Sequence, residues 1–255
     1  MDLGSSPKLY LLPHPKPDGL YMQLAKPPAR EIIFKKTLLI VLDLNGTLLV
    51  RKVRTSVNVA QVPSIKPDSQ TRSTSFTPRP HLEQFLQYAL ANHKVIIWSS
   101  AKPENVNKMV DNLLSADQRQ QVLRIWNRNQ LNLGPHYNKK VQVYKQLSWL
   151  WNDIEVQRSF RPEFGGYRWD QTNTVLIDDT LEKAASEPYN LLKIDEFSIT
   201  EDSLKVDVLG QVAAYLERLC WHDNVSACMR ESPYRTYLEQ DAEQFDWTRL
   251  GVHAG

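Results

Sequence analysis

Three continuous apolar runs along the chain each have the length of a single strand. They span Thr37–Leu42, Lys94–Trp98 and Asn173–Ile177, and they are rich in Val, Ile, Leu and Thr. A continuous apolar run, unlike an alternating one, is typical of a strand that is buried on both of its faces. The three runs therefore predict strands at the centre of one buried sheet.

Between and after these runs, apolar residues recur at helical spacing. Pro80 and Pro103 precede two of the patterns, and proline is well suited to the first turn of a helix. Strands that alternate with helices predict an α/β protein with a parallel sheet covered on both faces. In such sheets, ligands bind at the carboxyl ends of the strands. The four helical patterns are Leu82/Phe85/Leu86/Ala89, Val106/Met109/Val110/Leu113, Tyr144/Leu147/Leu150/Trp151 and Leu209/Val212/Ala213/Leu216/Leu219.

The pattern divides the chain into an arm, a domain and a tail. Residues 1–36 are an extended, proline-rich arm whose apolar residues favour wrapping around the domain. Residues 37–222 form the domain and residues 223–255 a mildly acidic tail. Within the domain, residues 51–80 interrupt the alternation with six basic residues against one acidic residue. This insertion is either a solvated loop or a flap whose positive charge attracts an anionic substrate.

Composition and charge indicate which partners and which cellular compartment to expect. The net charge is +2, from 31 basic and 29 acidic residues, so no nucleic-acid partner is indicated. The only cysteines, Cys220 and Cys228, are expected to be plain thiols in a reducing compartment. No apolar run is long enough to span a membrane, and the arm resembles neither a secretory nor a transit sequence. We expect an intracellular protein, nuclear or cytoplasmic rather than mitochondrial, whose arm, insertion or tail could bind a partner protein.

The first strand is followed by residues suited to phosphate chemistry. The sequence there is Asp43-Leu-Asn45-Gly46-Thr47. A carboxylate at the end of a central strand can act as a nucleophile toward phosphorus. Gly46 lets the chain turn sharply, which brings backbone N–H groups toward phosphate oxygens. A strand that ends in this way is also often only a turn.

The other strands supply further candidates. Ser99 and Ser100 follow the second strand as hydroxyl donors, and Asp178 and Asp179 follow the third as ligands suited to Mg²⁺. Lys145, near the start of the third helical pattern, could neutralise both a phosphate and an attacking carboxylate. Each feature alone has an ordinary structural explanation, as a helix cap or a solvated lysine. Their order along the chain favours one phosphate-binding site.

This arrangement resembles the haloacid dehalogenase superfamily, in its branch of RNA polymerase II C-terminal-domain phosphatases and nuclear-envelope relatives. Asp43-Leu-Asn-Gly-Thr-Leu stands where the branch has Asp-x-Asp-x-Thr-Leu, and Trp98-Ser99-Ser-Ala where it has its hydroxyl motif. Tyr144-Lys145-Gln-Leu is similar to its lysine motif, and Val175-Leu-Ile-Asp178-Asp179-Thr to its metal motif. The resemblance covers residues 37–219, and the chain as a whole is most similar to uncharacterised fungal members of this branch.

The resemblance implies a doubly wound parallel sheet, Mg²⁺, an aspartyl-phosphate intermediate and substrates that carry phosphoserine or phosphothreonine. By the same resemblance, Asp43, Asn45, Asp178 and Asp179 hold the metal. Ser99, Lys145 and Arg128 bind phosphate, and Thr47 completes the catalytic set with Asp43 and Asn45. The expected partner is therefore a phosphorylated protein or peptide.

Asn45 departs from the family pattern, because the family has an aspartate there. That aspartate ligates the metal through its backbone carbonyl and exchanges a proton through its side chain, and an asparagine retains only the first role. Three interpretations follow: a slow or specialised phosphatase, a pseudophosphatase that binds phosphorylated segments or scaffolds a complex, or an Asn45-Gly46 pair that deamidates. The retained Asp43, Ser99 and Lys145 favour the enzyme.

Overall fold

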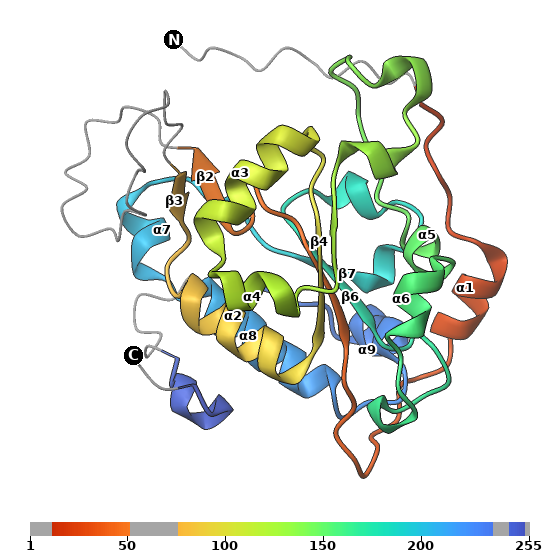
Figure 1. Ribbon diagram of the computed structural model, residues 1–255. Helices are drawn as coiled ribbons and strands as arrows, with labels where there is room; N and C mark the ends of the chain where they lie inside the picture. Colours follow the sequence, from red (N-terminus) through yellow and green to blue (C-terminus); the bar gives the residue numbers. More distant parts are fainter. Residues whose placement is uncertain (1–11, 52–75, 237–244, 253–255) are drawn as a thin grey trace.

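The protein is an α/β structure around a five-stranded parallel sheet (Figure 1). The computed structural model describes residues 12–51, 76–236 and 245–252. Strand β1 is central, and the order across the sheet is β5-β4-β1-β6-β7. The strands are β1 Leu39–Leu42, β4 Lys94–Trp98, β5 Arg124–Trp126, β6 Thr174–Asp178 and β7 Leu191–Lys193.

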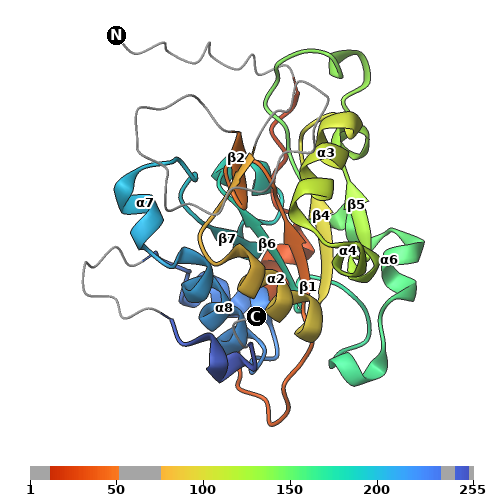
Figure 2. The ribbon, with the colours of Figure 1, turned by 60° about the vertical axis from the view of Figure 1, so that its left-hand side comes forward.

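Helices cover both faces of this sheet, because successive residues of each buried strand point to opposite sides. Ile40 and Leu42 pack into one apolar cluster, with α2 (Leu82–Asn92), α3 (Pro103–Leu113), α8 (Val208–Leu219) and α9 (Val225–Glu231). Leu39 and Val41 pack into a second cluster with α5 (Leu147–Trp151) and α6 (Ile154–Arg158). In Figure 2, α2 and α8 lie side by side in front of the sheet. The predicted fold class is confirmed.

The predicted strands and three of the four helical patterns correspond closely to observed elements. The exception is the pattern around Lys145. Helix α5 begins only at Leu147, so Lys145 lies in the extended segment before the helix and not in its first turn. The periodicity also did not reveal α6, α9 and the other short helical elements. These are α1 Gly19–Ala25, α4 Ala116–Gln121, α7 Glu201–Lys205, η1 Arg128–Leu131, η2 Gly134–His136, η3 Pro162–Phe164, η4 Leu181–Ala184, η5 Pro188–Asn190 and η6 Trp247–Leu250.

The insertion after the first strand begins and ends in an antiparallel pair of strands. These are β2 (Leu49–Arg51) and β3 (Phe76–Pro78), with Val50 opposite Thr77. Residues 52–75, which hold most of the basic residues of the predicted flap, lie outside the described part of the chain. The pair fixes the place where the insertion leaves the domain, directly after the turn that follows β1.

Both terminal regions pack on the domain where the structure describes them. In the arm, the Tyr21 hydroxyl of α1 accepts a hydrogen bond from the Tyr189 N–H (2.8 Å), and Arg230 of α9 donates to the Ala25 carbonyl (2.8 Å). Beyond residue 222, Trp247 and α9 contribute to the first apolar cluster. In the described part of the chain, every helix is too short or too polar to cross a bilayer.

Candidate functional site

The path of the chain brings the ends of β1 and β6 together. After β1 the chain adds β4 and β5 on one side of it, then returns to add β6 and β7 on the other. Such a reversal leaves a crevice at the carboxyl ends of the strands on either side of it. Leu42 pairs with Ile177, and the Asp43 N–H donates to the Ile177 carbonyl at 3.0 Å. The register therefore sets Asp43 beside Asp178.

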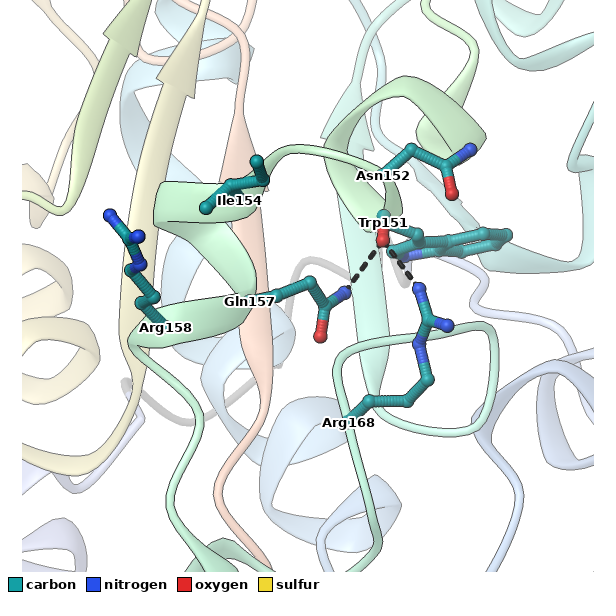
Figure 3. Close-up of a pocket in the computed structure, with 6 residues that line it drawn as sticks. All are labelled: Trp151, Asn152, Ile154, Gln157, Arg158 and Arg168. Atoms are coloured by element: carbon teal, nitrogen blue, oxygen red, sulfur yellow. Dashed lines mark hydrogen bonds between the residues drawn. The ribbon is translucent and has the colours of Figure 1, made fainter.

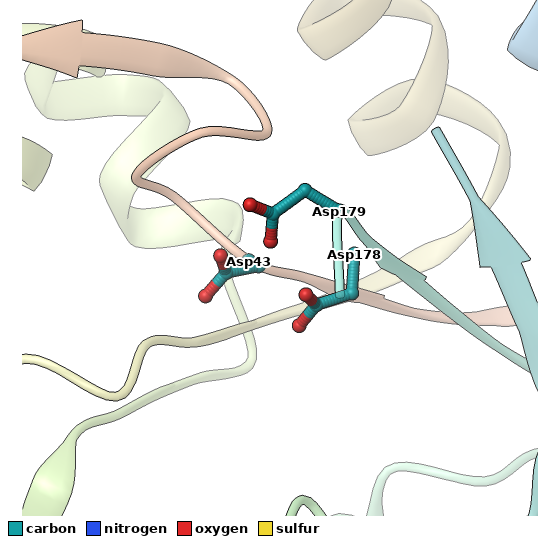
Figure 4. A group of neighbouring side chains, drawn as sticks. All are labelled: Asp43, Asp178 and Asp179. Carbon is teal, nitrogen blue, oxygen red and sulfur yellow. The ribbon is translucent and has the colours of Figure 1, made fainter. Parts of the chain in front are cut away.

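Three carboxylates meet at this edge of the sheet (Figure 4). Asp43 follows β1, Asp178 ends β6 and Asp179 comes next, and ligand oxygens from all three lie within 4.8 Å of one another. Asp43 and Asp178 are buried, and Asp179 is partly buried. Carboxylate oxygens at this spacing are the ligands that a hard divalent cation prefers. The residues present therefore fit a metal such as Mg²⁺.

Two lysines bind the carboxylates from different sides. The Lys145 ammonium donates to Asp43 Oδ1 (2.8 Å) and Asp178 Oδ2 (2.6 Å), and its side chain is fully buried. The Lys183 ammonium donates to Asp178 Oδ1 (2.7 Å), Asp179 Oδ1 (3.0 Å) and Asp43 Oδ2 (3.2 Å). Burial lowers the pKa of Lys183, but the three neighbouring carboxylates raise it above its ordinary value overall. Lys183 is therefore a cation at neutral pH.

The turn after Asp43 is shaped by Gly46. Its φ of +82° lies in the left-handed region, and a Cβ there would come within 2.6 Å of Asp179 Oδ2. Only glycine allows the turn to approach the carboxylates this closely. The Thr47 hydroxyl donates to Asp43 Oδ2 at 3.4 Å. Gly46 therefore makes the sharp turn that the sequence predicted, while a catalytic role for Thr47 stays a prediction.

A buried arginine stabilises the same turn through its backbone carbonyls. Arg79, just after β3, donates to the carbonyls of Thr47 (2.7 Å), Gly46 (3.3 Å) and Asp195 (2.7 Å). Its guanidinium also lies over the ring of Phe197, 4.9 Å from the centroid. Burial lowers the pKa of Arg79 to about 10, so it remains charged. Arg79 is thus a structural brace, although the sequence grouped it with the basic residues of the insertion.

The remaining predicted residues lie on the segments that follow β1, β4 and β5. Ser99 follows β4, the neighbour of β1, and its buried hydroxyl accepts a hydrogen bond from the Ala101 N–H at 3.3 Å. Asn45 lies on the turn after Asp43 and is exposed to solvent. Arg128 donates to the carbonyls of Ser100 (3.3 Å), Tyr137 (2.5 Å) and Lys139 (2.7 Å). Phosphate binding by Ser99 and Arg128 stays a prediction.

Lys183 is the site residue that sequence reasoning missed. It lies in η4, the single turn that follows β6, and it reaches back to Asp179. A lysine four residues after an acidic pair is within pairing distance on a helical turn, and that spacing was the available signal. A lysine in a short polar stretch otherwise suggests a solvated side chain.

A pocket elsewhere on the surface has different chemistry (Figure 3). Gln157 and Arg168 both donate to the Trp151 carbonyl in its wall, at 2.8 and 2.5 Å. The Trp151 indole bonds to Thr174, the first residue of β6, so this pocket lies toward the amino ends of the strands. Its lining includes no carboxylate, histidine or lysine: Trp151, Asn152, Ile154, Gln157, Arg158 and Arg168. The carboxylate cluster is therefore the better candidate for catalysis.

Comparison with known proteins leads to a phosphatase family. Residues 38–226 match the NLI interacting factor-like phosphatase family. An uncharacterised FCP1 homology domain-containing protein of Schizosaccharomyces pombe is 32% identical over 210 residues, covering 80% of each chain. A putative CTD phosphatase-like protein of Invertebrate iridescent virus 6 is 25% identical over 130 residues, covering 51% of this chain and 66% of the relative.

Among solved structures, the fission yeast RNA polymerase II CTD phosphatase Fcp1 aligns with 85% of this chain at 16% identity and a TM-score of 0.43. The aligned region is 62% of that structure, so the chain spans less than two thirds of it. The family is shown by the match over residues 38–226, which is most of the chain, together with the relative from Schizosaccharomyces pombe. The chain belongs to the NLI interacting factor-like phosphatases, the FCP1 homology branch that its motifs resemble.

Proposed function

We propose that this chain is a Mg²⁺-dependent phosphatase-like protein that acts on phosphoserine or phosphothreonine in other proteins, through an aspartyl phosphate at Asp43. The observation that carries the proposal is the buried Asp43 carboxylate, which the Lys145 ammonium contacts at 2.8 Å at the carboxyl end of the central strand. A carboxylate at the end of a central strand, beside an ammonium that offsets negative charge, is suited to attack phosphorus.

The first step transfers the phosphoryl group to the protein. One Asp43 oxygen forms a bond to phosphorus, and the bond from phosphorus to the serine or threonine oxygen breaks. Lys145 offsets the negative charge that Asp43 and the phosphate bring together. Asp43, Asp178, Asp179 and the Asn45 backbone carbonyl would hold Mg²⁺, which would supply further positive charge to the phosphate oxygens. Hydrolysis of the aspartyl phosphate by water then releases phosphate and restores Asp43.

Asn45 sets the expected rate. The departing serine or threonine oxygen needs a proton, and the attacking water must lose one. An amide side chain does neither near neutral pH, and a missing general acid or base lowers rates by about 10²–10⁴. We therefore expect slow turnover, with binding of phosphate and metal retained.

The same substitution supports a second candidate function, a pseudophosphatase that binds a phosphorylated segment or scaffolds a complex. Asn45 is exposed on the turn, where it could still donate a hydrogen bond to a bound phosphate. In this case Asp43 serves only to organise the cluster, and a bound phosphopeptide is retained instead of hydrolysed. The two candidates differ in whether a covalent bond to Asp43 ever forms.

The test is Mg²⁺-dependent release of phosphate from p-nitrophenyl phosphate by the native chain and by Asn45→Asp. We expect slow native release and an increase of about 10²–10⁴ in Asn45→Asp. A phosphoserine peptide then replaces p-nitrophenyl phosphate, because its poor leaving group depends more strongly on the proton donor.

Two controls separate the candidates. Asp43→Asn removes the nucleophile with little change in size, and the enzyme interpretation requires that it abolish all release. Retention of a phosphopeptide by Asp43→Asn, combined with no native release, would establish the binder. Native release that survives in Asp43→Asn would exclude the aspartyl phosphate.

A further inference from the structure

Lys183 occupies the place among the carboxylates where a divalent cation is expected. Its ammonium lies 2.7 Å from Asp178 Oδ1, 3.0 Å from Asp179 Oδ1 and 3.2 Å from Asp43 Oδ2. These are the three residues whose oxygens come within 4.8 Å of one another. A cation at their centre and the Lys183 ammonium would therefore need the same oxygens.

Lys145 differs from Lys183 in this respect. It contacts the other oxygen of each of two carboxylates, Asp43 Oδ1 and Asp178 Oδ2, at 2.8 and 2.6 Å. Its side chain has no exposed area, while that of Lys183 is 9% exposed and that of Asp179 is 11% exposed. Lys145 therefore binds from the interior, and Lys183 binds from the side of the cluster that opens to solvent.

The oxygens that Lys183 contacts are the outer carboxylate oxygens of the cluster. The charges favour one cation at a time on these outer oxygens. Among the described residues, three carboxylates and two ammonium groups meet here, and the excess is one negative charge. A divalent cation added to this set would reverse the net charge and lie against the Lys183 ammonium across shared oxygens. Like charges at such a separation in a buried site repel strongly.

We propose that Lys183 and a divalent metal ion occupy the outer carboxylate oxygens alternately, so that Lys183 is an internal competitor for the metal. This inference rests on the proposed function, because it assumes that a metal binds at Asp43. Lys183 keeps the carboxylates paired in the metal-free protein. When the metal binds, the flexible side chain swings toward solvent, where its ammonium becomes available to an anionic substrate.

The first test compares Mg²⁺ binding by the native chain, Lys183→Met and Lys145→Met, measured by isothermal titration calorimetry. If Lys183 fills the site for about nine-tenths of the time, it weakens the apparent affinity about tenfold. We therefore expect Lys183→Met to bind Mg²⁺ about tenfold more tightly than the native chain, and more tightly than Lys145→Met. Equal affinities in the two variants would indicate a general effect of charge and overturn the proposal.

The second test uses the native chain, so it does not depend on the folding of a variant. Exposed amines are methylated with formaldehyde and a borohydride, with and without Mg²⁺, and each lysine is quantified by mass spectrometry. We expect Mg²⁺ to increase methylation of Lys183 about tenfold, matching the population that it displaces, while Lys145 stays protected. A Lys183 that is equally protected with Mg²⁺ bound would overturn the proposal.

The outcomes also separate this inference from the proposed function. If Mg²⁺ binds, but Lys183→Met leaves the affinity unchanged and Mg²⁺ leaves the methylation of Lys183 unchanged, only the competition is wrong. If the native chain and Lys183→Met both fail to bind Mg²⁺, the competition and the metal requirement of the proposed function fail together.

Discussion

Buried polar groups gather at both ends of the parallel strands, and the two groups differ in kind. At the amino ends, His93 precedes β4, and its Nδ1 accepts the Leu38 N–H at 3.3 Å. Its Nε2 lies 3.0 Å from the Tyr88 hydroxyl, which donates to Glu217 at 2.8 Å. This sequence of bonds requires a neutral His93 protonated on Nε2. Each of these donors then has an acceptor within the network.

At the carboxyl ends, charge replaces this neutral pairing. Asp43, Asp178 and Asp179 carry one more charge than Lys145 and Lys183 neutralise. A buried network whose partners are fully matched makes the fold rigid and specific. A buried cluster with an unbalanced charge retains affinity for a cation from solution. Burial of polar groups therefore does not by itself mark a functional site, and an unbalanced charge among them is the stronger indication.

Among these substitutions, replacing Lys145 is expected to cause the largest loss in the free energy of unfolding. Lys145→Met leaves three carboxylates, of which Asp43 and Asp178 are buried, with one ammonium. Breaking a buried ion pair in this way costs about 3–5 kcal/mol. Urea denaturation in EDTA should show this loss in the free energy of unfolding. The double variant Asp43→Asn/Lys145→Met restores the balance and should recover part of it. A loss below about 1 kcal/mol would indicate that the cluster is much more hydrated than its burial implies.

Neutralising one carboxylate should remove the excess negative charge of the cluster. Asp178→Asn leaves two carboxylates with two ammonium groups, so the metal-free protein should keep a melting temperature close to the native one. Its affinity for Mg²⁺ should fall by more than about 100-fold, since loss of a mere outer partner of a metal ligand costs about 10–100-fold. Calorimetric titration with Mg²⁺ measures this change. Unchanged affinity would place the metal elsewhere.

The neutral network predicts a dependence of stability on acid. Burial, with a smaller contribution from the Lys35 charge, lowers the pKa of His93 from 6.5 to about 3. Between these values the unfolded chain binds a proton that the native protein does not, so stability falls as the pH falls below 6.5. The slope from this one group is about 1.4 kcal/mol per pH unit.

Denaturation of the native chain and His93→Gln at several pH values measures that slope. Gln at this position keeps an acceptor and a donor but does not titrate, so the variant should show a shallower decline between pH 6.5 and pH 3. His222→Gln, at a partly exposed histidine, is the matched control and should decline as the native chain does. Parallel curves for all three proteins would refute a neutral, buried His93.

The smallest effect is expected where the neutral network reaches the surface. Lys35 pairs with Glu217 at 2.7 Å, and 36% of its side chain is exposed. Solvent screens such a pair, so Lys35→Ala should change the free energy of unfolding by less than about 1 kcal/mol. Chemical denaturation of both proteins should show a smaller difference in the free energy of unfolding at high salt than at low salt. A larger, salt-independent loss would make Lys35 part of the buried network.

The sequence predicted the parts of the site that depend on strand ends. The meeting of Asp43 and Asp178 was predictable because continuous apolar runs identify buried strands, and the parallel arrangement gathers their carboxyl ends at one edge. Lys183 was not recognised, although its spacing from Asp179 is local, because a lysine in a short polar stretch is usually solvated. Arg79 was not recognised because it acts through contacts between segments distant in the chain. Arg79 binds the carbonyls of Thr47 and Asp195, which no local pattern reveals.

The helices show the same limit. The apolar stripes of α2, α3 and α8 are long enough to be read from periodicity. The start of α5 was placed too early because Tyr144 fits the stripe. The Glu187 carboxylate, however, accepts the Leu147 N–H at 2.9 Å and fixes the start of the helix there. That bond joins a residue that precedes β6 in the sequence to one that follows it. The spacing of apolar residues gives no sign of such a contact.

One backbone contact bears on how this family can diversify. The Lys145 N–H donates to the Lys183 carbonyl at 2.7 Å, so the two cationic residues are fastened to each other through the main chain. The polypeptide between them passes through an exposed stretch around Tyr167, whose side chain is fully exposed, before it returns in β6. Residues can be gained or lost in that stretch over evolutionary time without changing the distance between the two ammonium groups. Relatives of unequal length there should share one arrangement of charges, and a library of loop insertions at Tyr167 should retain the site.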